Sequence, residues 1–331
     1  MNYAFTHIGM FKTATTYMQN LWLNNDNYNL SWQGNIKFLK EVRNRVAIEK
    51  SLNDLAIELN TDPQRVEGNN LIISNEGFSG AYINQLNNQS KGHKFINEIS
   101  KILGCLEVTN DKLLIVVRDP LSWIKSAFTQ AIKQGWDGNT QKFVDEQKLF
   151  LFNSLDFRYI YQSYNRYFNN ILVLPFELLK DDEDKLWQII SDKFNVPLVN
   201  NRMQKLNVSL DDKRIFLLSK MNEMSNRTVN ILADSNSYKN EREKNNIING
   251  YNQSKMWVHR RFVEHAKEKE INELYQVFNL SKNDISDDFY HFELPKKLID
   301  GIENNYFNAL EGKIEDKYLK DYRKKFIKKL I

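Results

Sequence analysis

The sequence predicts an α/β fold in which a parallel sheet is flanked by helices and followed by a helical C-terminal cap. Short apolar runs without polar alternation are typical of strands that are buried on both faces. Apolar residues at steps of three and four lie between these runs, which indicates alternating strands and helices. After about residue 200 the strand pattern disappears and only helical spacing continues.

Four runs are expected to form the strands, and they lie at residues 3–8, 71–74, 113–117 and 171–176. Three of them are rich in Ile, Val and Leu. Helical spacing is found before the third run and directly after it, where Trp123, Ile124 and Phe128 recur. Helices are also expected around 215–221, 257–278 and 319–330.

The chain reads as a single domain of 331 residues, because we find no Gly/Ser-rich or Pro-rich linker. The α/β core is expected at residues 1–200 and the mostly helical part at residues 201–331. The single cysteine excludes an internal disulfide. There is no signal-peptide pattern and no apolar run near 18 residues, so we expect a cytoplasmic protein without a membrane span.

The C-terminal segment is basic, with eight Lys/Arg against three acids from Lys313 to Ile331. We interpret it as an amphipathic helix with solvated lysines. Its docking residues would be Leu319, Tyr322, Phe326 and Leu330. The alternative is attraction to an anionic glycan or a membrane surface. No nucleic-acid partner is expected.

A loop after the first strand is a candidate anion site. From Gly9 it reads Gly-Met-Phe-Lys-Thr-Ala-Thr-Thr. Against the P-loop template Gly-x-x-x-x-Gly-Lys-Ser/Thr, Ala14 replaces the second glycine and Thr15 replaces the lysine. The lysine is Lys12, inside the loop. Backbone N–H groups at a helix start and this charge still predict anion binding. Three threonines add hydroxyls: Thr13, Thr15 and Thr16. The alternative is an ordinary Thr-capped helix.

A second candidate anion site follows the third strand. Arg118 closes that strand, Pro120 opens the next helix, and Ser126 follows the arginine by eight residues. An arginine at the carboxyl end of a strand and a hydroxyl on the next helix can bind one phosphate together. Alternatively, Arg118 is paired with Asp119 or another carboxylate.

Together these segments resemble the sulfotransferases that use 3′-phosphoadenosine-5′-phosphosulfate (PAPS), in particular bacterial members that act on carbohydrates. In that family a loop close to Lys-Thr-Gly-Thr-Thr binds the 5′-phosphosulfate. A segment close to Arg-Asp-Pro, with a serine eight residues after the arginine, binds the 3′-phosphate. Residues 173–179, Val-Leu-Pro-Phe-Glu-Leu-Leu, are similar to the family's strand that ends in Tyr-Glu-Asp-Leu. The resemblance covers residues 1–200 and implies a P-loop-like core.

The resemblance implies PAPS as donor, adenosine 3′,5′-bisphosphate as product, and no metal. The nucleotide ligands that it implies are Phe11, Lys12, Thr13, Ala14, Thr15, Thr16, Arg118, Ser126, Asn207 and Ser209. Residues 201–209 look like a segment that closes over the nucleotide in relatives. Ala14, Phe11 and Phe176 depart from the family's usual glycine, proline and tyrosine. A methyl group at residue 14 is harmless at negative φ but crowds the loop at positive φ.

Sulfuryl transfer resembles phosphoryl transfer, so catalysis is mostly positioning and electrostatics. Lys12 is expected to stabilise the leaving phosphate. An alcohol acceptor needs a general base, and Glu76 follows the second strand at its carboxyl end. Carbohydrate-acting relatives often carry a catalytic glutamate in such a Ser-x-Glu segment. The alternative for Glu76 is a helix-capping or lysine-paired carboxylate, and His93 is the second candidate base.

The expected function is therefore transfer of a sulfuryl group from PAPS to a hydroxyl of a carbohydrate or glycoconjugate. A small-molecule alcohol, phenol or amine is an open alternative as acceptor. Two other classes also stay open, namely a P-loop nucleotide kinase or NTPase and a non-catalytic nucleotide-binding relative. The missing Gly-Lys-Ser/Thr disfavours the kinase, and we see no convincing acidic Mg²⁺ ligand at the third strand.

Overall fold

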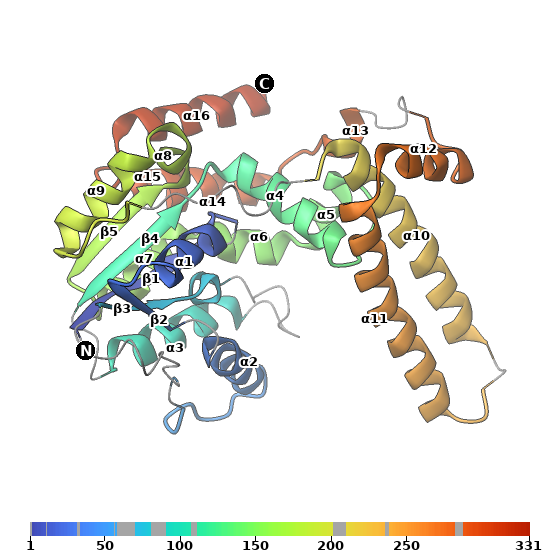
Figure 1. The fold of residues 1–331 in the computed structure, drawn as a ribbon, viewed down its shortest axis with the longest axis horizontal. Coiled ribbons are helices and arrows are strands. Elements are labelled where there is room, and N and C mark those ends of the chain that lie inside the picture. The colour runs from blue at the N-terminus through green and yellow to red at the C-terminus, as the bar shows by residue number, and fades with distance from the viewer. Residues whose placement is uncertain are drawn as a thin grey trace. The chain divides into compact units, whose positions relative to one another are not determined.

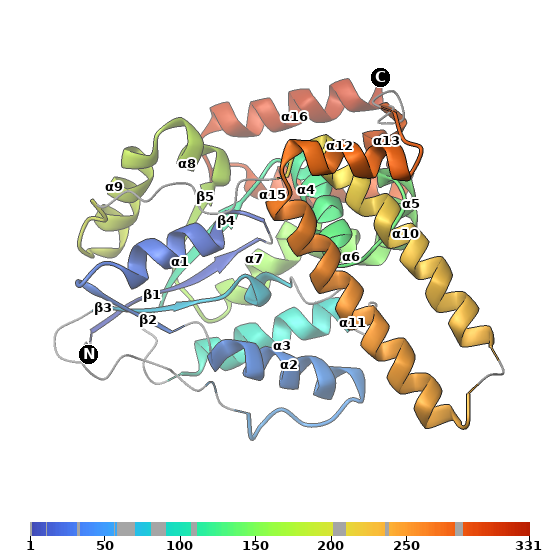
Figure 2. The same cartoon turned by 45° about the vertical axis from the view of Figure 1, so that its right-hand side comes forward.

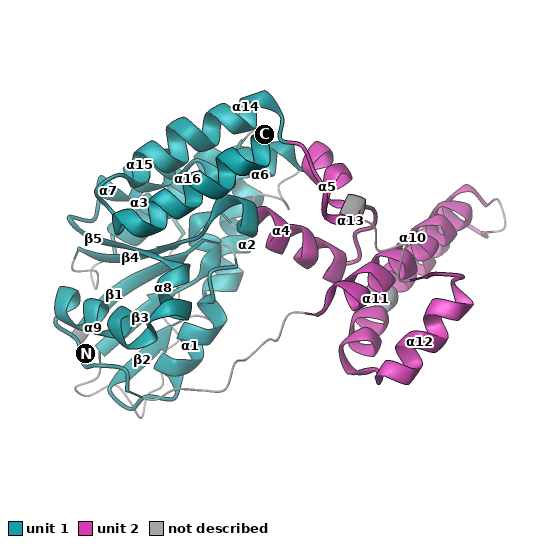
Figure 3. Cartoon of the chain, turned by 90° about the horizontal axis from the view of Figure 1, so that it is seen from above, with its two compact units in different colours: residues 1–123, 147–206, 294–331 teal, residues 124–146, 207–293 magenta. Residues whose placement is uncertain are grey.

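The computed structural model describes residues 2–10, 12–31, 34–55, 57, 70–80, 91–106, 111–200, 210–235, 238–281 and 287–331. The chain forms two compact units, coloured separately in Figure 3. The first comprises residues 1–123, 147–206 and 294–331, and the second comprises residues 124–146 and 207–293.

The first unit is built on a five-stranded sheet of order β2-β3-β1-β4-β5 (Figure 1). Its strands are β1 (Asn2–Gly9), β2 (Tyr28–Ser31), β3 (Asn70–Ser74), β4 (Lys112–Val117) and β5 (Asn170–Pro175). Its α-helices are α1 (Thr15–Leu23), α2 (Gly34–Ala47), α3 (Gly92–Gly104), α6 (Lys148–Leu155), α7 (Phe157–Asn165), α8 (Phe176–Asp181), α9 (Glu183–Phe194), α14 (Lys296–Gly301), α15 (Asn308–Leu310) and α16 (Asp316–Leu330). It also contains a 3₁₀-helix, η2 (Glu76–Ser79), and a π-helix, η6 (Ile302–Phe307).

Every neighbouring pair of strands is parallel, which confirms the predicted α/β class with a parallel sheet. The four predicted strands are present within one or two residues of their predicted ends. β5 ends at Pro175, one residue before its predicted end, and Phe176 begins α8. The edge strand β2 was not predicted, because two of its four residues are polar. Asn29 and Ser31 are nevertheless buried there.

Helices cover both faces of the sheet, with α1 and α9 on one face and α2 and α3 on the other (Figure 2). On the first face, the ring of Phe5 lies 5.6 Å from Trp22 in α1 and 4.9 Å from Phe194 in α9. Trp22 in turn lies 6.0 Å from Trp187. Such aromatic contacts add stability beyond the buried apolar area. Because both faces of β1 are covered, its side chains from Ala4 to Ile8 are buried, including the polar Thr6 and His7.

The strand order places a topological switch point at β1 and β4. From β1 the chain runs to β2 and β3 on one side, and it then returns to β4 and β5 on the other. Open α/β sheets bind ligands in the crevice at such a point, outside the carboxyl ends of the strands. The loop after β1 and the arginine after β4 lie at these ends.

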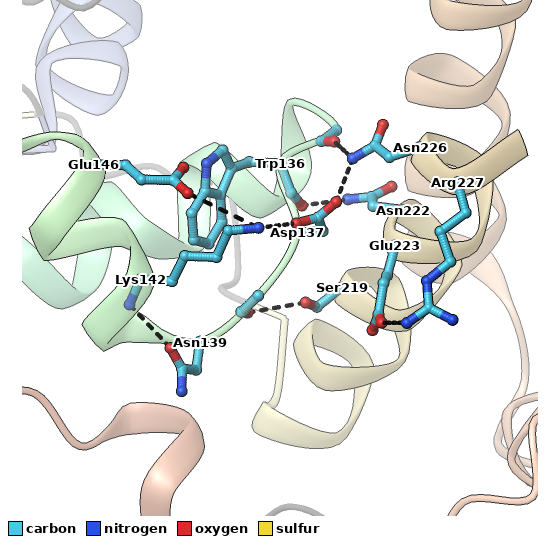
Figure 4. A network of polar contacts seen from close by, with 12 residues as sticks. Trp136, Asp137, Asn139, Lys142, Glu146, Ser219, Asn222, Glu223, Asn226 and Arg227 are labelled. Atoms are coloured by element: carbon cyan, nitrogen blue, oxygen red, sulfur yellow. Dashed lines mark hydrogen bonds and ion pairs between the residues drawn. The ribbon is translucent and has the colours of Figure 1, made fainter. Parts of the chain in front are cut away.

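The second unit consists of helices, and α4 (Pro120–Lys133) runs into it from the first unit. Its other helices are α5 (Thr140–Glu146), α10 (Asp212–Asp234), α11 (Glu241–His265), α12 (Glu268–Val277) and α13 (Asp287–Tyr290). Asn222 of α10 donates to the carbonyl of Ile132 and to that of Trp136, and Ser219 donates to the carbonyl of Gly138. Figure 4 shows Ser219 and Asn222 beside Trp136. These bonds join residues 124–146 to α10, so the two units do not divide at residue 200.

Residues 294–331 belong to the first unit. The predicted amphipathic helix is α16, in which Leu319, Tyr322 and Phe326 are buried. Leu330 is 42% exposed, so its predicted docking role is wrong. No helix in the described part of the chain combines the length and hydropathy that a membrane crossing requires.

Candidate active site

The loop between β1 and α1 contains two strained backbone positions. Lys12 has φ 67°, and Ala14, at the N-cap of α1, has φ 60° and ψ 25°. A non-glycine residue in this left-handed region costs about 1 kcal/mol. Ala14 is thus in the conformation that favours the glycine usual in the resembled family. Strain of this kind tends to persist where function requires the loop shape.

Replacing Ala14 by glycine is expected to raise the free energy of unfolding by roughly 0.5–1 kcal/mol, because the left-handed conformation carries no Cβ penalty for glycine. Urea denaturation measures this change. Ala131, which lies in the regular helix α4, serves as the control. Its replacement by glycine should instead lower stability by about 1 kcal/mol. Equal losses in both variants would contradict the assigned strain.

The threonine side chains shape this loop from inside. The hydroxyl of Thr13 donates to the carbonyl of Met10 over 2.6 Å, and the side chain of Thr15 is buried. A Cβ on Gly9 would clash with both hydroxyl oxygens, so only glycine fits there. Thr16 is exposed. The hydroxyl of Thr13 is therefore engaged within the loop, whereas that of Thr15 has no hydrogen-bond partner among the described residues.

The N-terminus of α1 remains suited to an anion. Its N-cap residue, Ala14, makes no side-chain hydrogen bond to the first turn. The first N–H groups of a helix have no intrahelical partner, and the helix dipole favours negative charge there. Lys12 adds a positive charge two residues before the N-cap.

A buried network supports the loop from β1 and β3. His7 Nδ1 lies 2.8 Å from Ser74 Oγ, and the side-chain Nε2 of Gln19 donates to the same Ser74 oxygen over 3.0 Å. Burial lowers the pKa of His7 to about 3, so this imidazole is neutral at pH 7. His7 is a structural residue that ties α1 to the strand ends.

Arg118 lies directly against this loop. Its Nη1 donates to the carbonyl of Lys12 over 2.9 Å, and its guanidinium carbon lies 4.8 Å from the ring centre of Phe176. The Nε atom is buried and has no hydrogen-bond partner among the described residues. Burial lowers the pKa of Arg118, although the nearby carboxylates of Glu177 and Asp119 oppose this shift. The guanidinium thus has donors for a further acceptor.

Asp119 has a contact of its own, because its Oδ1 accepts the N–H of Ser122 over 2.7 Å in the first turn of α4. The carboxylates of Glu177 and Asp119 nevertheless interact electrostatically with Arg118. Anion binding by Arg118 and its pairing with a carboxylate therefore both stay open.

Glu76 is the first residue of η2, after the end of β3. Asn75 supplies the cap by accepting the N–H of Gly77 over 2.8 Å, so Glu76 is not the capping residue. Ser79 donates to the carbonyl of Gly9 over 2.7 Å, which joins η2 to the loop. Burial raises the pKa of Glu76, and the positive charge of Lys12 partly opposes this. Lys12 and Glu76 therefore interact electrostatically at one site.

His93, the second candidate base, makes contacts between helices. It lies in the first turn of α3, and its Nε2 is 3.2 Å from an oxygen of Asp156. Its ring stacks on Tyr159 of α7 at 3.9 Å. These contacts hold α3 against α7, and a proton-transfer role for His93 stays a prediction.

The remaining predicted ligands stay predictions. Ser126 lies on α4, in the part of that helix assigned to the second unit. Phe11, Asn207 and Ser209 lie outside the described residues.

Sequence reasoning missed Glu177, Tyr306 and Tyr322. The side chain of Glu177 accepts the N–H of Asp119 over 3.2 Å and the hydroxyl of Tyr322. Tyr306 contacts the backbone of Arg118, 188 positions away along the chain. Only Glu177 lies in a segment that resembled the family. The spacing predicted Tyr322 as a docking residue of the last helix and not as a residue of this site, and Tyr306 carries no local signal.

The second unit contains a cavity of about 810 Å³. Its charged residues are paired, with 2.7 Å between Lys142 Nζ and Asp137 Oδ1 and 2.6 Å between Arg227 and Glu223 (Figure 4). None of the predicted nucleotide-binding residues that the structure describes lines this cavity. Lys12 and Arg118 belong to the first unit.

No protein-family model matches the chain, and no curated protein matches it. Among solved structures, the chain is similar to the crystal structure of a sulfotransferase from Alicyclobacillus acidocaldarius. The two share 10% sequence identity with a TM-score of 0.43, over 70% of this chain and 94% of that chain. At this TM-score and identity the likeness establishes no shared function.

Proposed function

We propose that this protein is a PAPS-dependent sulfotransferase. The observation that carries the proposal is the hydrogen bond from Arg118 to the carbonyl of Lys12. It joins the two predicted phosphate-binding segments at the carboxyl ends of β1 and β4. A donor with phosphate groups at both its 5′ and 3′ positions fits such a pair of neighbouring cationic segments.

The residues present fit this donor. Arg118 offers a buried Nε that lacks a partner among the described residues, and it would hold the 3′-phosphate. Lys12 and the first N–H groups of α1 would hold the 5′-phosphosulfate. Bound there, PAPS supplies an electrophilic sulfuryl group, while Lys12 stabilises the charge that develops on the 5′-phosphate.

Glu76 is the proposed general base. It removes the proton from the acceptor hydroxyl as that oxygen attacks. A carboxylate whose pKa is raised by burial is a better base than an exposed one, and the positive charge of Lys12 favours its ionised form. His93 is less suitable, because its ring is already held by Asp156 and Tyr159. We propose a carbohydrate or glycoconjugate hydroxyl as acceptor, and a small-molecule hydroxyl or amine as the alternative.

Calorimetry with adenosine 3′,5′-bisphosphate and with Mg²⁺–ATP tests the donor. We expect at least about tenfold tighter binding of the bisphosphate, which corresponds to roughly 1.4 kcal/mol. EDTA should leave that affinity unchanged. Tighter binding of Mg²⁺–ATP would instead support the kinase or NTPase class.

The catalytic part of the proposal is tested by transfer of ³⁵S from labelled PAPS to a panel of oligosaccharides, phenols and amines. Nucleotide binding without any labelled product would indicate a non-catalytic relative.

A further inference from the structure

On the side of β5, the sheet offers no ladder hydrogen bonds to the backbone of Arg118. Val117, the last residue of β4, pairs with Pro175, the last residue of β5. Proline has no N–H group, and the chain turns into α8 directly after it. The parallel ladder therefore ends here, although the partly buried N–H and C=O groups of Arg118 that follow still need partners.

The C-terminal part of the chain supplies those partners. The hydroxyl of Tyr306 accepts the N–H of Arg118 over 3.2 Å and donates to the C=O of the same residue. One side chain thus satisfies both backbone groups of the arginine. The hydroxyl also lies 3.5 Å from Met10 Sδ, at the start of the phosphate loop. A single oxygen therefore contacts both of the proposed nucleotide-binding segments.

The neighbouring residue is held in a similar way. The N–H of Asp119 donates to Glu177, whose second oxygen accepts the hydroxyl of Tyr322 in α16. Two tyrosines from the C-terminal segment thus act on consecutive residues after β4, one directly and one through a glutamate.

Tyr306 itself is rigidly placed. It is fully buried in the π-helix η6, and its ring packs edge-on against Phe157 and Phe307 at 6.1 and 6.0 Å. Single π-turns are rare and occur frequently at functional sites. The turn places this hydroxyl at the end of β4, where the ladder stops.

We propose that Tyr306 is a positioning residue that sets the direction of the Arg118 side chain. It fixes the backbone of Arg118, so that the guanidinium both reaches the carbonyl of Lys12 and faces the bound anion. The identity of that anion as a 3′-phosphate rests on the proposed function. Loss of the hydroxyl leaves two partly buried backbone groups without their partner and loosens the end of the strand.

The first test uses the ligand-free protein and does not depend on the proposed function. Tyr306→Phe should speed hydrogen exchange at the Arg118 amide by up to about tenfold, which corresponds to roughly 1.4 kcal/mol and lies within the contribution of one hydrogen bond. Tyr28→Phe is the matched control. Tyr28 is the first residue of the edge strand β2 and is buried like Tyr306. Its hydroxyl donates to the carbonyl of Pro197. Unchanged exchange at Arg118 in Tyr306→Phe would overturn the proposal.

The second test compares affinities for adenosine 3′,5′-bisphosphate and adenosine 5′-monophosphate, which lacks the 3′-phosphate. The preference for the bisphosphate should fall about tenfold in Tyr306→Phe, fall further in Arg118→Ala, and stay unchanged in Tyr28→Phe. An equal loss for both nucleotides would show a merely structural role and overturn the proposal. If the wild-type protein binds neither nucleotide, the proposed function fails, and the exchange experiment alone decides the role of Tyr306.

A second variant covers the case in which Tyr306→Phe does not fold. Tyr322→Phe releases the carboxylate that holds the N–H of Asp119. It should speed exchange at the Asp119 amide and weaken the bisphosphate preference in the same direction. Unchanged exchange at Asp119 would count against the proposed role of the C-terminal segment.

Discussion

Replacement of Glu76 by glutamine is expected to lower kcat for an alcohol acceptor by about two to four orders of magnitude, the usual contribution of a general base. Glutamine keeps the shape of the side chain and removes its proton-accepting capacity. Binding of adenosine 3′,5′-bisphosphate should stay within about twofold of the wild type, because the base faces the acceptor. Product formation from ³⁵S-labelled PAPS and calorimetry measure the two effects.

The pH dependence of kcat/KM is a second measure of the role of Glu76. Burial raises the pKa of Glu76, so the acidic limb of kcat/KM should lie above the ordinary glutamate value of 4.5. This limb should be absent in the glutamine variant. Glu273→Gln, an exposed carboxylate on α12, serves as the control and should change neither rate nor profile. An unchanged kcat in Glu76→Gln would move the role of base to His93.

The raised pKa also has a consequence for stability. Between 4.5 and the raised value, the folded state binds more protons at Glu76 than the unfolded state does. The contribution of this residue to stability therefore falls as pH rises through that window and stays low above it. Glutamine avoids the cost of burying a charge. The Glu76→Gln variant should thus be more stable than the wild type at pH 7 and show no such difference at low pH.

Replacement of Lys12 by alanine is expected to lower kcat by about a hundred- to a thousandfold, through loss of charge stabilisation at the leaving phosphate. The substitution does not change the backbone cost at φ 67°, because alanine also carries a Cβ. The folding free energy should therefore change little. Loss of the positive charge should raise the pKa of Glu76 further and move the acidic limb to higher pH.

Lys40→Ala is the matched control for Lys12, since Lys40 is exposed on α2. It should leave kcat and the pH profile unchanged. Lys12→Arg retains the charge, so the acidic limb of its kcat/KM profile should lie close to that of the wild type. Its kcat should recover less fully relative to Lys12→Ala. A Lys12→Ala variant with the turnover of the wild type would exclude this lysine from the reaction.

The second unit has no counterpart in what the sequence predicted. Its helices were expected from their spacing, but the joining of residues 124–146 to α10 was not. That joining depends on side-chain amides such as Asn222, which reach carbonyls 90 and 86 positions away. A polar residue within a helical pattern gives no indication that it will be buried against a distant loop.

By itself, the sequence determined the α/β class, four of the five strands, and the two segments that carry Lys12 and Arg118. These features are local, because apolar runs, helical spacing and short motifs are written in consecutive residues. The strand β2 was missed since its burial comes from pairing with β3 and not from its own composition. Only the tertiary structure decided that β1 and β4 are neighbours, that Ala14 is left-handed, and that Tyr306 holds Arg118. The strand pairing and the Tyr306 contact join residues far apart along the chain, so no local pattern could predict them. The backbone angle of Ala14 is local, but alanine is compatible with either sign of φ and its identity alone does not fix the angle.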